Sequence, residues 1–478
     1  MHLSLVIIQF MKRFLTYRFI SLKYPMGLKL IISLVLLLAF FSAHGQKPVT
    51  GVAPDHQWTG YRGSLARGVF DQADLPESWS VTERKNLKWR VEIPGLGLSC
   101  PVIWGDKVFI TTAVSKTDSG GLKTGIFGDV TSVGENSEHE WRIYCFDKNK
   151  GKIIWENIAY TGVPEIKRHP KSTHANCTVA TDGRHVVCFF GSEGLYCYDM
   201  DGRLMWKKDF GILRAAFFSA PSAEWEFASS PVLFQGRVIV QCDVLENSFL
   251  ASLDADTGAE IWKISRDDYP TWATPNVYWN AGRPIVVVNG YKHMGGYDFQ
   301  TGKEIWRMSG GGDIPIPTPV IGENLIYFNG AHGRQSPIIA VKKEATGDIT
   351  LSNDQTSNEY VAWSLPRAGS YLQTMILYEG LLYSCEWNGS ISCFNALTGD
   401  RIYRNKLGAA NSFTASPVIA DGKLYISDDE GTVYIVQTGK TFRVIGNAQL
   451  GDVCMTSPAI TEGMMIFRTQ HYLLAIGD

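Results

Sequence analysis

The chain of 478 residues has little net charge, because 45 Lys and Arg residues against 47 Asp and Glu residues leave a formal charge of −2. A nucleic-acid binder held by a broad basic field is therefore excluded. The GxSxG and HExxH signatures are also absent, so serine hydrolases and zinc proteases of the familiar kinds have no support. We expect no nucleic-acid partner and assign no metal site from sequence motifs.

The apolar run near the N-terminus is too short for a membrane anchor. Lys29 precedes an apolar stretch over residues 30–41, well below the roughly 20 residues that cross a bilayer as a helix. The pattern predicts a signal peptide over residues 1–45, with cleavage after Gly45 and Met26 as a candidate start. We therefore expect a periplasmic or secreted protein with no membrane span after cleavage.

Cysteines are few and odd in number, which argues against a regular disulfide framework. Cys145, Cys197 and Cys393 occupy a repeated position that elsewhere holds Ser, Gly or Ala, so we expect them to pack as small apolar residues. Cys188 with Cys197, and Cys385 with Cys393, flank short turns almost symmetrically, which leaves two cross-strand disulfides open. The nine cysteines are at positions 100, 145, 177, 188, 197, 242, 385, 393 and 454.

Glycine and aromatic residues are abundant, and they recur in one phrase. "LDADTGAEIW" at 253–262 is nearly repeated as "YDFQTGKEIW" at 297–306, with further copies at 146–155, 198–206 and 394–403. Asp or Asn can bond to its own backbone in a turn, and Gly takes the positive φ that a tight turn requires. Each phrase therefore predicts a strand, a turn and a second strand.

A second phrase precedes the first in each repeat. Ser or Thr followed by Pro is separated by five residues from a turn Gly, as in Pro231 to Gly236, Pro417 to Gly422 and Pro458 to Gly463. This spacing predicts a hairpin whose inner strand starts at the Pro. With looser copies included, eight inner strands are predicted to start near positions 101, 178, 231, 275, 319, 375, 417 and 458.

Joined together, the two phrases make a four-stranded antiparallel meander with a period of roughly 40 to 57 residues, as in a propeller blade. The sequence predicts an all-β, eight-bladed β-propeller over residues 87–478, preceded by an extended segment over 46–86. The last blade lacks a strand, and the isolated strand Leu87–Ile93, which carries Trp89, is predicted to complete it. We expect a monomer.

Three long insertions interrupt the blades, at about residues 114–140, 209–228 and 343–360. The first is rich in Gly, Ser, Thr and Lys, the second in aromatic residues, and the third in polar residues. Loops of this kind often carry function. We expect only the aromatic insertion to shape a binding surface.

The repeated Asp, Thr-Gly and Trp resemble the repeats of the quinoprotein alcohol dehydrogenase-like propellers, called pyrroloquinoline-quinone (PQQ) repeats. The resemblance covers residues 58–478, and "WTGYRG" and "HPKSTHANCT" are similar to exported bacterial members of mostly unassigned activity. It implies that a Trp on most blades docks on the neighbouring blade, with Tyr403 as a substitute in blade six and no aromatic at this position in blade seven. The docking residues implied are Trp89, Trp155, Trp206, Trp262, Trp306 and Trp363.

The same resemblance covers both enzymes and scaffolds. Quinoprotein dehydrogenases often carry adjacent cysteines against PQQ and a calcium ion held by carboxylates, and some bind haem through CxxCH. This sequence has neither adjacent cysteines nor CxxCH. The propeller lipoprotein of the outer-membrane barrel-assembly machine is a non-catalytic scaffold of the same repeat type, although its lipidated Cys is missing here.

Candidate binding residues lie where inner strands start and second strands end, because these positions surround the channel of a propeller. His174 is the foremost candidate, and Asp243 or Glu386 could act as a base or a calcium ligand. The ligand-binding candidates are Lys171, His174, Asn176, Asp243, Arg266 and Glu386, with His293, His332, Arg334, Asp428 and Gln470 as further polar residues at the mouth.

Three functions remain open from the sequence. The leading hypothesis is an exported, non-catalytic binding or scaffold propeller with a protein or small-molecule ligand at the channel mouth and no assigned cofactor. The first alternative is a dehydrogenase of alcohols or sugars that uses PQQ and calcium. The second is a carbohydrate-binding or carbohydrate-processing propeller that uses Trp225.

Overall fold

The computed structural model describes residues 57–478, except for 118–119, 126–130, 333–334, 353 and 409–410. The predicted signal peptide, its cleavage site and Arg334 lie outside the described residues. None of the helices in this part of the chain has the length and apolar character that a membrane span requires.

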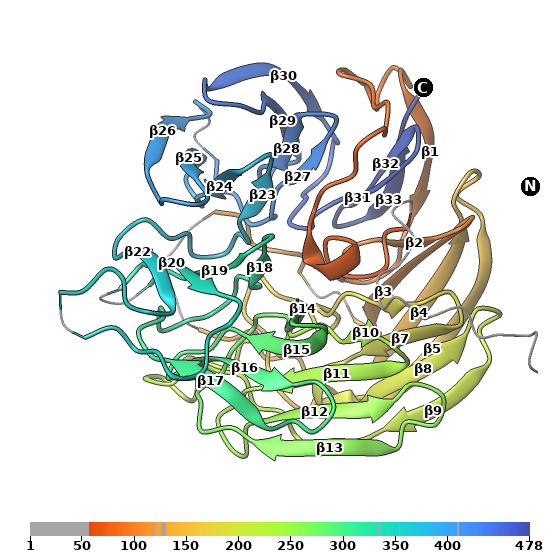
Figure 1. Ribbon diagram of the computed structural model, residues 1–478. Coiled ribbons are helices and arrows are strands. Elements are labelled where there is room, and N and C mark those ends of the chain that lie inside the picture. The colour runs from red at the N-terminus through yellow and green to blue at the C-terminus, as the bar shows by residue number, and fades with distance from the viewer. Residues whose placement is uncertain (1–56, 118–119, 126–130, 333–334, 353, 409–410) are drawn as a thin grey trace, which may run out of the picture. The chain divides into compact units, whose positions relative to one another are not determined.

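Eight sheets follow one another along the described chain and form the blades (Figure 1). Blade one contains β2 (Val102–Trp104), β3 (Lys107–Ser115), β4 (His139–Asp147) and β5 (Ile153–Gly162); blade two contains β6 (Ala180–Thr181), β7 (His185–Phe189), β8 (Leu195–Asp199) and β9 (Leu204–Lys208). Blade three contains β10 (Val232–Phe234), β11 (Arg237–Cys242), β12 (Phe249–Asp254) and β13 (Glu260–Ser265); blade four contains β14 (Asn276–Asn280), β15 (Arg283–Val288), β16 (Met294–Asp298), β17 (Glu304–Met308) and β21 (Gly347–Asp348).

The remaining blades follow the same order. Blade five contains β18 (Val320–Ile321), β19 (Leu325–Asn329), β20 (Ile338–Lys342) and β22 (Val361–Leu365); blade six contains β23 (Ile376–Tyr378), β24 (Leu381–Cys385), β25 (Ser390–Asn395) and β26 (Arg401–Lys406). Blade seven contains β27 (Val418–Ala420), β28 (Lys423–Ser427), β29 (Thr432–Gln437) and β30 (Arg443–Gln449); blade eight contains β31 (Ala459–Thr461), β32 (Met464–Arg468), β33 (Tyr472–Ile476) and β1 (Leu87–Glu92).

The eight predicted blades are confirmed, with each inner strand starting one or two residues after its predicted position. The inner hairpins turn at glycines with positive φ, such as Gly236 at 72°, Gly422 at 70° and Gly463 at 67°. One strand was not predicted: β21, from the polar insertion, pairs in parallel with β17 and widens blade four to five strands. The sequence missed it because β21 is only two residues long and carries no alternating pattern.

The ring closes between the two ends of the described chain, as predicted. Strand β1 pairs antiparallel with β33, and Trp89 lies opposite Ala475. Figure 1 shows β1 beside the C-terminal strands β31–β33. This pairing gives blade eight its fourth strand, which the C-terminal segment alone does not supply.

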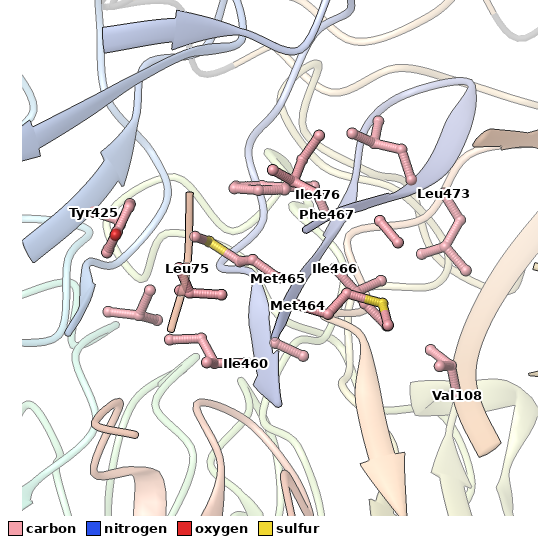
Figure 2. Close-up of a cluster of buried hydrophobic side chains, with 14 of the residues drawn as sticks. Leu75, Val108, Tyr425, Ile460, Met464, Met465, Ile466, Phe467, Leu473 and Ile476 are labelled. Carbon is pink, nitrogen blue, oxygen red and sulfur yellow. The ribbon is translucent and has the colours of Figure 1, made fainter. Parts of the chain in front are cut away.

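Burial follows from the stacking of the blades. The second strand of blade two, β7, is buried at all five positions, because both faces of its sheet lie against neighbouring blades. The outer strand β13 is exposed at four of its six positions and buries Trp262. Figure 2 shows one inter-blade core, in which Met464, Phe467 and Ile476 of blade eight pack among side chains of neighbouring segments.

Five of the six predicted docking tryptophans make one recurrent contact with the next blade. The indole lies over the turn glycine of that blade, and its Nε1 donates a hydrogen bond to a backbone oxygen of the same turn. A Cβ on any of these glycines would lie 2.6–2.8 Å from the indole. The pairs are Trp89 with Gly151 and Lys148 O, Trp155 with Gly202 and Met200 O, Trp206 with Gly258 and Ala255 O, Trp262 with Gly302 and Phe299 O, and Trp363 with Gly399 and Ala396 O.

Trp306 contacts the next blade in a different way. Its Nε1 donates to Tyr278 Oη of its own blade at 3.0 Å, and its ring meets Phe328 of blade five edge-on, with centroids 5.9 Å apart. The turn glycine of blade five, Gly347, is displaced into β21 and has no atom near its Cβ position. Tyr403 of blade six packs against Phe442 of blade seven, with centroids 5.7 Å apart.

The two disulfides left open by the sequence do not form, and all nine cysteines are free and buried. In the β7–β8 hairpin, Cys188 lies opposite Tyr196 while Cys197 lies opposite Val187. The two thiols are therefore out of register by one residue and point to opposite faces of the sheet. Cys385 lies opposite Ile391 and Cys393 lies opposite Tyr383, so these two thiols share a face of the sheet but are offset by two residues along the ladder.

The segment before β1 crosses one end of the channel. Trp58 forms an antiparallel bridge with Ile103. The buried guanidinium of Arg62 donates to Pro417 O at 2.9 Å and to Met375 O at 3.1 Å, which ties the segment to blades six and seven. In Figure 1 this segment, in orange-red, lies at the centre of the ring.

Candidate functional site

A belt of hydroxyl groups surrounds the channel where the inner strands start. At six described junctions, a backbone N–H at the start of one blade donates a hydrogen bond to a Ser or Thr hydroxyl at the start of the following blade. This explains the repeated Ser or Thr before Pro. The bonds are Cys100 N to Thr178, Thr178 N to Ser230, Ser230 N to Thr274, Thr318 N to Thr374, Thr374 N to Ser416 and Ser416 N to Ser457, at 2.9–3.1 Å.

The belt encloses a cavity of about 150 Å³. Tyr61 closes it on the side of the N-terminal segment, where its hydroxyl lies 3.0 Å from Ser416 Oγ. Burial raises the pKa of Tyr61, which therefore stays a neutral phenol. Asn176, Trp272 and Leu372 line the other end of the cavity and belong to the loops that precede inner strands. This second end is called the mouth below.

His174 is buried beside the mouth between two carboxylates. Its Nδ1 lies 2.5 Å from Glu226 Oε2, and its Nε2 lies 3.1 Å from Glu135 Oε2. Glu135 also accepts hydrogen bonds from Arg168, at 2.7 Å to Oε1 and 3.1 Å to Oε2, and lies 3.6 Å from His139 Nε2. The side chains of His174, His139 and Arg168 are each no more than 2% exposed.

Hydrogen bonds and neighbouring charges, rather than solvent, determine the protonation states of this cluster. Burial alone would lower the pKa of His174, but the carboxylates of Glu135 and Glu226 outweigh it and raise the pKa to about 9. Burial would raise the pKa of Glu135, but the hydrogen bonds from His139, His174 and Arg168 hold it far below its usual range. The cluster therefore holds an ionised carboxylate against a histidine that readily carries positive charge.

A third buried carboxyl group lies near the first two. Burial and the charge of Glu226 raise the pKa of Glu193 to about 8, so Glu193 is protonated at neutral pH. Its Oε1 accepts a hydrogen bond from Glu165 N at 3.1 Å, while its Oε2 has no partner among the described residues. Burial raises the pKa of Glu226 as well, while its hydrogen bond with His174 favours the ionised form.

Lys171 and Asn176, two other predicted residues, flank His174 but are engaged within the fold. Lys171 Nζ donates to Asp429 Oδ2 at 2.8 Å and to Gly125 O at 2.7 Å, which links the loop of blade two to blade seven. The amide of Asn176 donates to Ser172 Oγ at 2.8 Å and to Phe227 O at 3.1 Å. Both residues fix the loop that carries His174.

Asp243 and Arg266 lie together in a separate, fully buried network. Arg266 Nε donates to Asp243 Oδ1 at 2.7 Å, and Nη2 donates to Asp268 Oδ2 at 3.0 Å. Gln241 Nε2 donates to the second oxygen of Asp243 at 2.7 Å. Because these groups already satisfy one another, the arrangement has the character of a structural ion pair.

The remaining predicted residues are dispersed. Glu386 forms a two-bond ion pair with Arg404, at 2.9 and 2.8 Å. His332 Nδ1 lies 2.7 Å from Asp313 Oδ1, and Asp428 accepts from Asn411 at 2.9 Å. Gln470 accepts from Leu122 N at 3.0 Å. His293 takes part through its backbone, with its carbonyl 3.3 Å from Arg266 Nη2.

Eight aromatic rings form a connected surface around the mouth, and we call them the mouth aromatics. Seven are partly exposed and His332 is exposed. Phe218 stacks on Tyr269 and on Tyr291, each with centroids 4.8 Å apart, and Phe217 stacks on Trp225 with an interplanar angle of 2°. The set comprises Phe217, Phe218, Trp225, Tyr269, Trp272, Tyr291, His332 and Tyr371, and each ring touches at least one other.

The described residues do not fit PQQ with calcium. A cavity of about 150 Å³ is smaller than the roughly 300 Å³ at which small-molecule pockets begin. The two carboxylates predicted as calcium ligands, Asp243 and Glu386, do not converge, and each is paired with its own arginine. No reaction step through these groups follows from the site.

Sequence reasoning missed Glu135, His139, Arg168 and Glu226. Glu226 belongs to the insertion that was expected to shape a surface, whereas Glu135 belongs to the insertion rich in Gly, Ser, Thr and Lys, which was not. The available signal was only that each insertion contains several acidic residues. Nothing in the repeat pattern indicates that the two would meet at His174.

Comparison with known proteins points to one family. The family model described as outer membrane protein assembly factor BamB matches residues 139–388, slightly more than half of the chain. A curated BamB of Shewanella oneidensis is 20% identical over 276 residues, which are 56% of this chain and 65% of that protein. BamB of Yersinia pestis is 18% identical over 330 residues, 68% of this chain and 66% of that protein. The matches span just under two thirds of both relatives.

Solved structures with the same fold include a BamB and two dehydrogenases. BamB from Moraxella catarrhalis aligns with a TM-score of 0.50 and 14% identity over 77% of this chain and 98% of that one. A europium-containing methanol dehydrogenase aligns at 0.58 and 11% over 87% and 91%. The quinohemoprotein alcohol dehydrogenase from Comamonas testosteroni aligns at 0.57 and 11% over 89% and 81%. At such identities these likenesses show the fold alone.

Proposed function

The chain belongs to the family described as outer membrane protein assembly factor BamB, and on this premise we propose that it is a non-catalytic scaffold propeller of the bacterial cell envelope. Its partner would be a protein involved in building the outer membrane, held at the channel mouth. The predicted signal peptide over residues 1–45 agrees with an exported protein.

The observation that carries the proposal is the surface of mouth aromatics. Partly exposed aromatic side chains are enriched at protein interfaces, because each ring buries a large apolar area with little loss of side-chain entropy. Here they come from the aromatic insertion and from connections of blades three to six. A protein surface can cover several of these rings at once, whereas the cavity behind them is about 150 Å³.

Within this surface, Phe218, Tyr269 and Tyr291 make the centre of the proposed interface. Lys292 Nζ lies 4.7 Å from the ring centroid of Tyr269, which adds a positive charge beside the aromatic group. Trp225, by contrast, has Phe217 stacked on one face of its indole and Trp272 beside it. Trp225 therefore supports Phe217 in our proposal.

The proposal is tested in the source bacterium. A strain that lacks the gene is complemented with the full-length protein or with the double variant Phe218→Ala and Tyr269→Ala, and folded outer-membrane proteins are quantified in isolated envelopes. We expect the unmodified protein to restore their amount and the double variant to fail, because its interface loses two stacked rings.

Phe442→Ala is the matched control, because Phe442 is also a partly buried aromatic but packs at Tyr403, away from the mouth. Circular dichroism of the purified variants checks that each one folds. Full restoration by the double variant would contradict the role of the mouth aromatics. An unchanged envelope in the strain without the gene would contradict the assembly function itself.

The enzymatic alternative has a separate test. Purified protein is titrated with PQQ and calcium in a calorimeter, and dye-linked oxidation of alcohols and sugars is then measured. We expect neither heat of binding nor turnover, because the cavity inside the belt has a volume of about 150 Å³ and the carboxylates of Asp243 and Glu386 are each paired with an arginine. Tight binding together with turnover would overturn the non-catalytic proposal.

A further inference from the structure

Two imidazoles and one carboxylate converge beside the mouth. One nitrogen of His139, one nitrogen of His174 and one oxygen of Glu135 all lie within 4.8 Å of one another. Glu135 Oε2 is 3.1 Å from His174 Nε2 and 3.6 Å from His139 Nε2. Ligand atoms bound at about 2.0–2.1 Å in a tetrahedron lie roughly 3.3 Å apart, so these separations bracket those of a metal's coordination shell.

The hydrogen bonds on the far side of each ring leave the inner nitrogens available. His139 Nδ1 lies 2.8 Å from the carbonyl oxygen of Ser137, which only accepts, so Nδ1 carries the hydrogen. His174 Nδ1 lies 2.5 Å from Glu226 Oε2, which places its hydrogen there as well. When an ion replaces the proton between His174 Nε2 and Glu135, both rings keep their hydrogen on Nδ1, and both Nε2 lone pairs can point towards the ion.

We propose that His139 Nε2, His174 Nε2 and Glu135 Oε2 bind a divalent transition-metal ion of the zinc type. Two imidazoles and one carboxylate are a common ligand set for such ions. Glu226 and the carbonyl of Ser137 would orient the ligating rings from behind, as carboxylates and backbone carbonyls do around zinc histidines. The site goes beyond the scaffold function and does not depend on it.

The charges around the cluster favour a bound cation. Glu135 and Glu226 contribute two negative charges and Arg168 contributes one positive charge, which leaves a net negative charge beside the two imidazoles. Arg168 Nη2 binds Glu135 Oε1 at 2.7 Å, which leaves Oε2 with a lone pair directed at the histidines. A carboxylate oxygen can accept from Arg168 Nε and ligate an ion together, because it has two lone pairs.

The ligands come from segments that the repeats do not otherwise join. Glu135 lies in the first insertion, His139 opens β4 in blade one, and His174 lies in the loop before β6. Glu226, which hydrogen-bonds to His174, lies in the aromatic insertion next to Phe227. Its backbone carbonyl accepts a hydrogen bond from Trp272 Nε1 at 2.8 Å. The ion would therefore join the first insertion and β4 of blade one to the loop before β6 of blade two. Through Glu226, it would also stabilise the aromatic insertion, which carries part of the mouth aromatics.

The test uses the full purified protein after treatment with EDTA and dialysis. Zn²⁺ is titrated calorimetrically, and Co²⁺ is added in parallel because its visible absorption reports the coordination geometry. We expect one equivalent of Zn²⁺ to bind and Co²⁺ to give the spectrum of a nitrogen- and oxygen-ligated site. His139→Ala and Glu135→Gln should abolish both signals, and Glu226→Gln should weaken affinity about 10- to 100-fold.

His185→Asn is the matched control, since His185 is equally buried and lies between two carboxylates, Asp182 and Asp256, at 2.9 Å each. It should bind Zn²⁺ like the unmodified protein. Glu135→Gln keeps the size and hydrogen-bonding shape of the side chain, so a folded Glu135→Gln protein that still binds one equivalent would overturn the site. Absence of any Zn²⁺ or Co²⁺ binding by the unmodified protein would overturn it too.

Discussion

The turn glycine of the repeat does two things at once. In "LDADTGAEIW", Asp254 Oδ1 accepts hydrogen bonds from Thr257 N at 2.9 Å and from its hydroxyl at 2.8 Å, which shapes the turn. Gly258 then takes a φ of 69° and lies under the indole of Trp206. The residue is required both by its backbone angle and by the ring that covers it.

Gly258→Ala tests this double requirement at the scale of one residue. We expect it to lower the free energy of unfolding by about 1–2 kcal/mol through left-handed strain and by about a further 1–3 kcal/mol through the clash with Trp206. Gly236→Ala is the control, because Gly236 has a φ of 72° with no atom near its Cβ position. Equal losses in urea unfolding of the two variants would show that the indole contact adds nothing.

The candidate site is built from residues that are far apart in the sequence. His174 was predicted as the foremost ligand-binding candidate, and its two carboxylate partners are 39 and 52 residues away in the sequence. Both come from insertions, where no repeat sets the register. The local sequence therefore pointed to His174 but not to the two carboxylates that hydrogen-bond to it.

At the scale of the strand, the Ser/Thr-Pro start of each inner strand has a physical explanation. Pro lacks an N–H and sits where the strand begins, while the preceding hydroxyl accepts the N–H of the blade before it. Ser230 shows both halves, since its hydroxyl accepts from Thr178 N at 2.9 Å and its own N–H donates to Thr274 at 3.1 Å. The belt thus satisfies backbone groups that the short inner strands leave unpaired.

Ser230→Ala should break one link of the belt. The variant leaves the buried N–H of Thr178 without an acceptor, which we expect to lower the free energy of unfolding by about 1–3 kcal/mol. Ser252→Ala is the matched control, because the Ser252 hydroxyl is equally buried but has no hydrogen-bond partner among the described residues. The prediction fails if chemical denaturation shows the same stability change in both variants.

At the scale of the whole described molecule, stability depends on a junction between segments that the chain does not join locally. Blades one to seven are each built from consecutive segments, apart from the added β21, whereas blade eight combines β1 with β31–β33. Trp89 and Trp363 make the same contact with a turn glycine and are both 7% exposed. They differ in that only Trp89 sits on the strand that closes the ring.

Trp89→Ala should therefore open the ring, while Trp363→Ala should not. Each truncation should cost about 3–5 kcal/mol of stability. In hydrogen exchange followed by mass spectrometry, we expect Trp89→Ala to raise exchange in both β1 and β33, and Trp363→Ala to raise it only near blades five and six. Protected β1 and β33 in the Trp89→Ala protein would argue against closure through this contact.

The sequence by itself determined the number of blades, the starts of their inner strands, the closing strand and the aromatic positions between blades. It could do so because a repeated unit shows its periodicity in every copy, and the contacts between copies repeat as well. Only the tertiary structure decided that Cys188 and Cys197 point apart, that Trp306 binds Tyr278, and that Asp243 and Glu386 are paired elsewhere. It alone brought Glu135 and Glu226 to His174, because insertions are placed by packing against the finished ring and not by the period that built it.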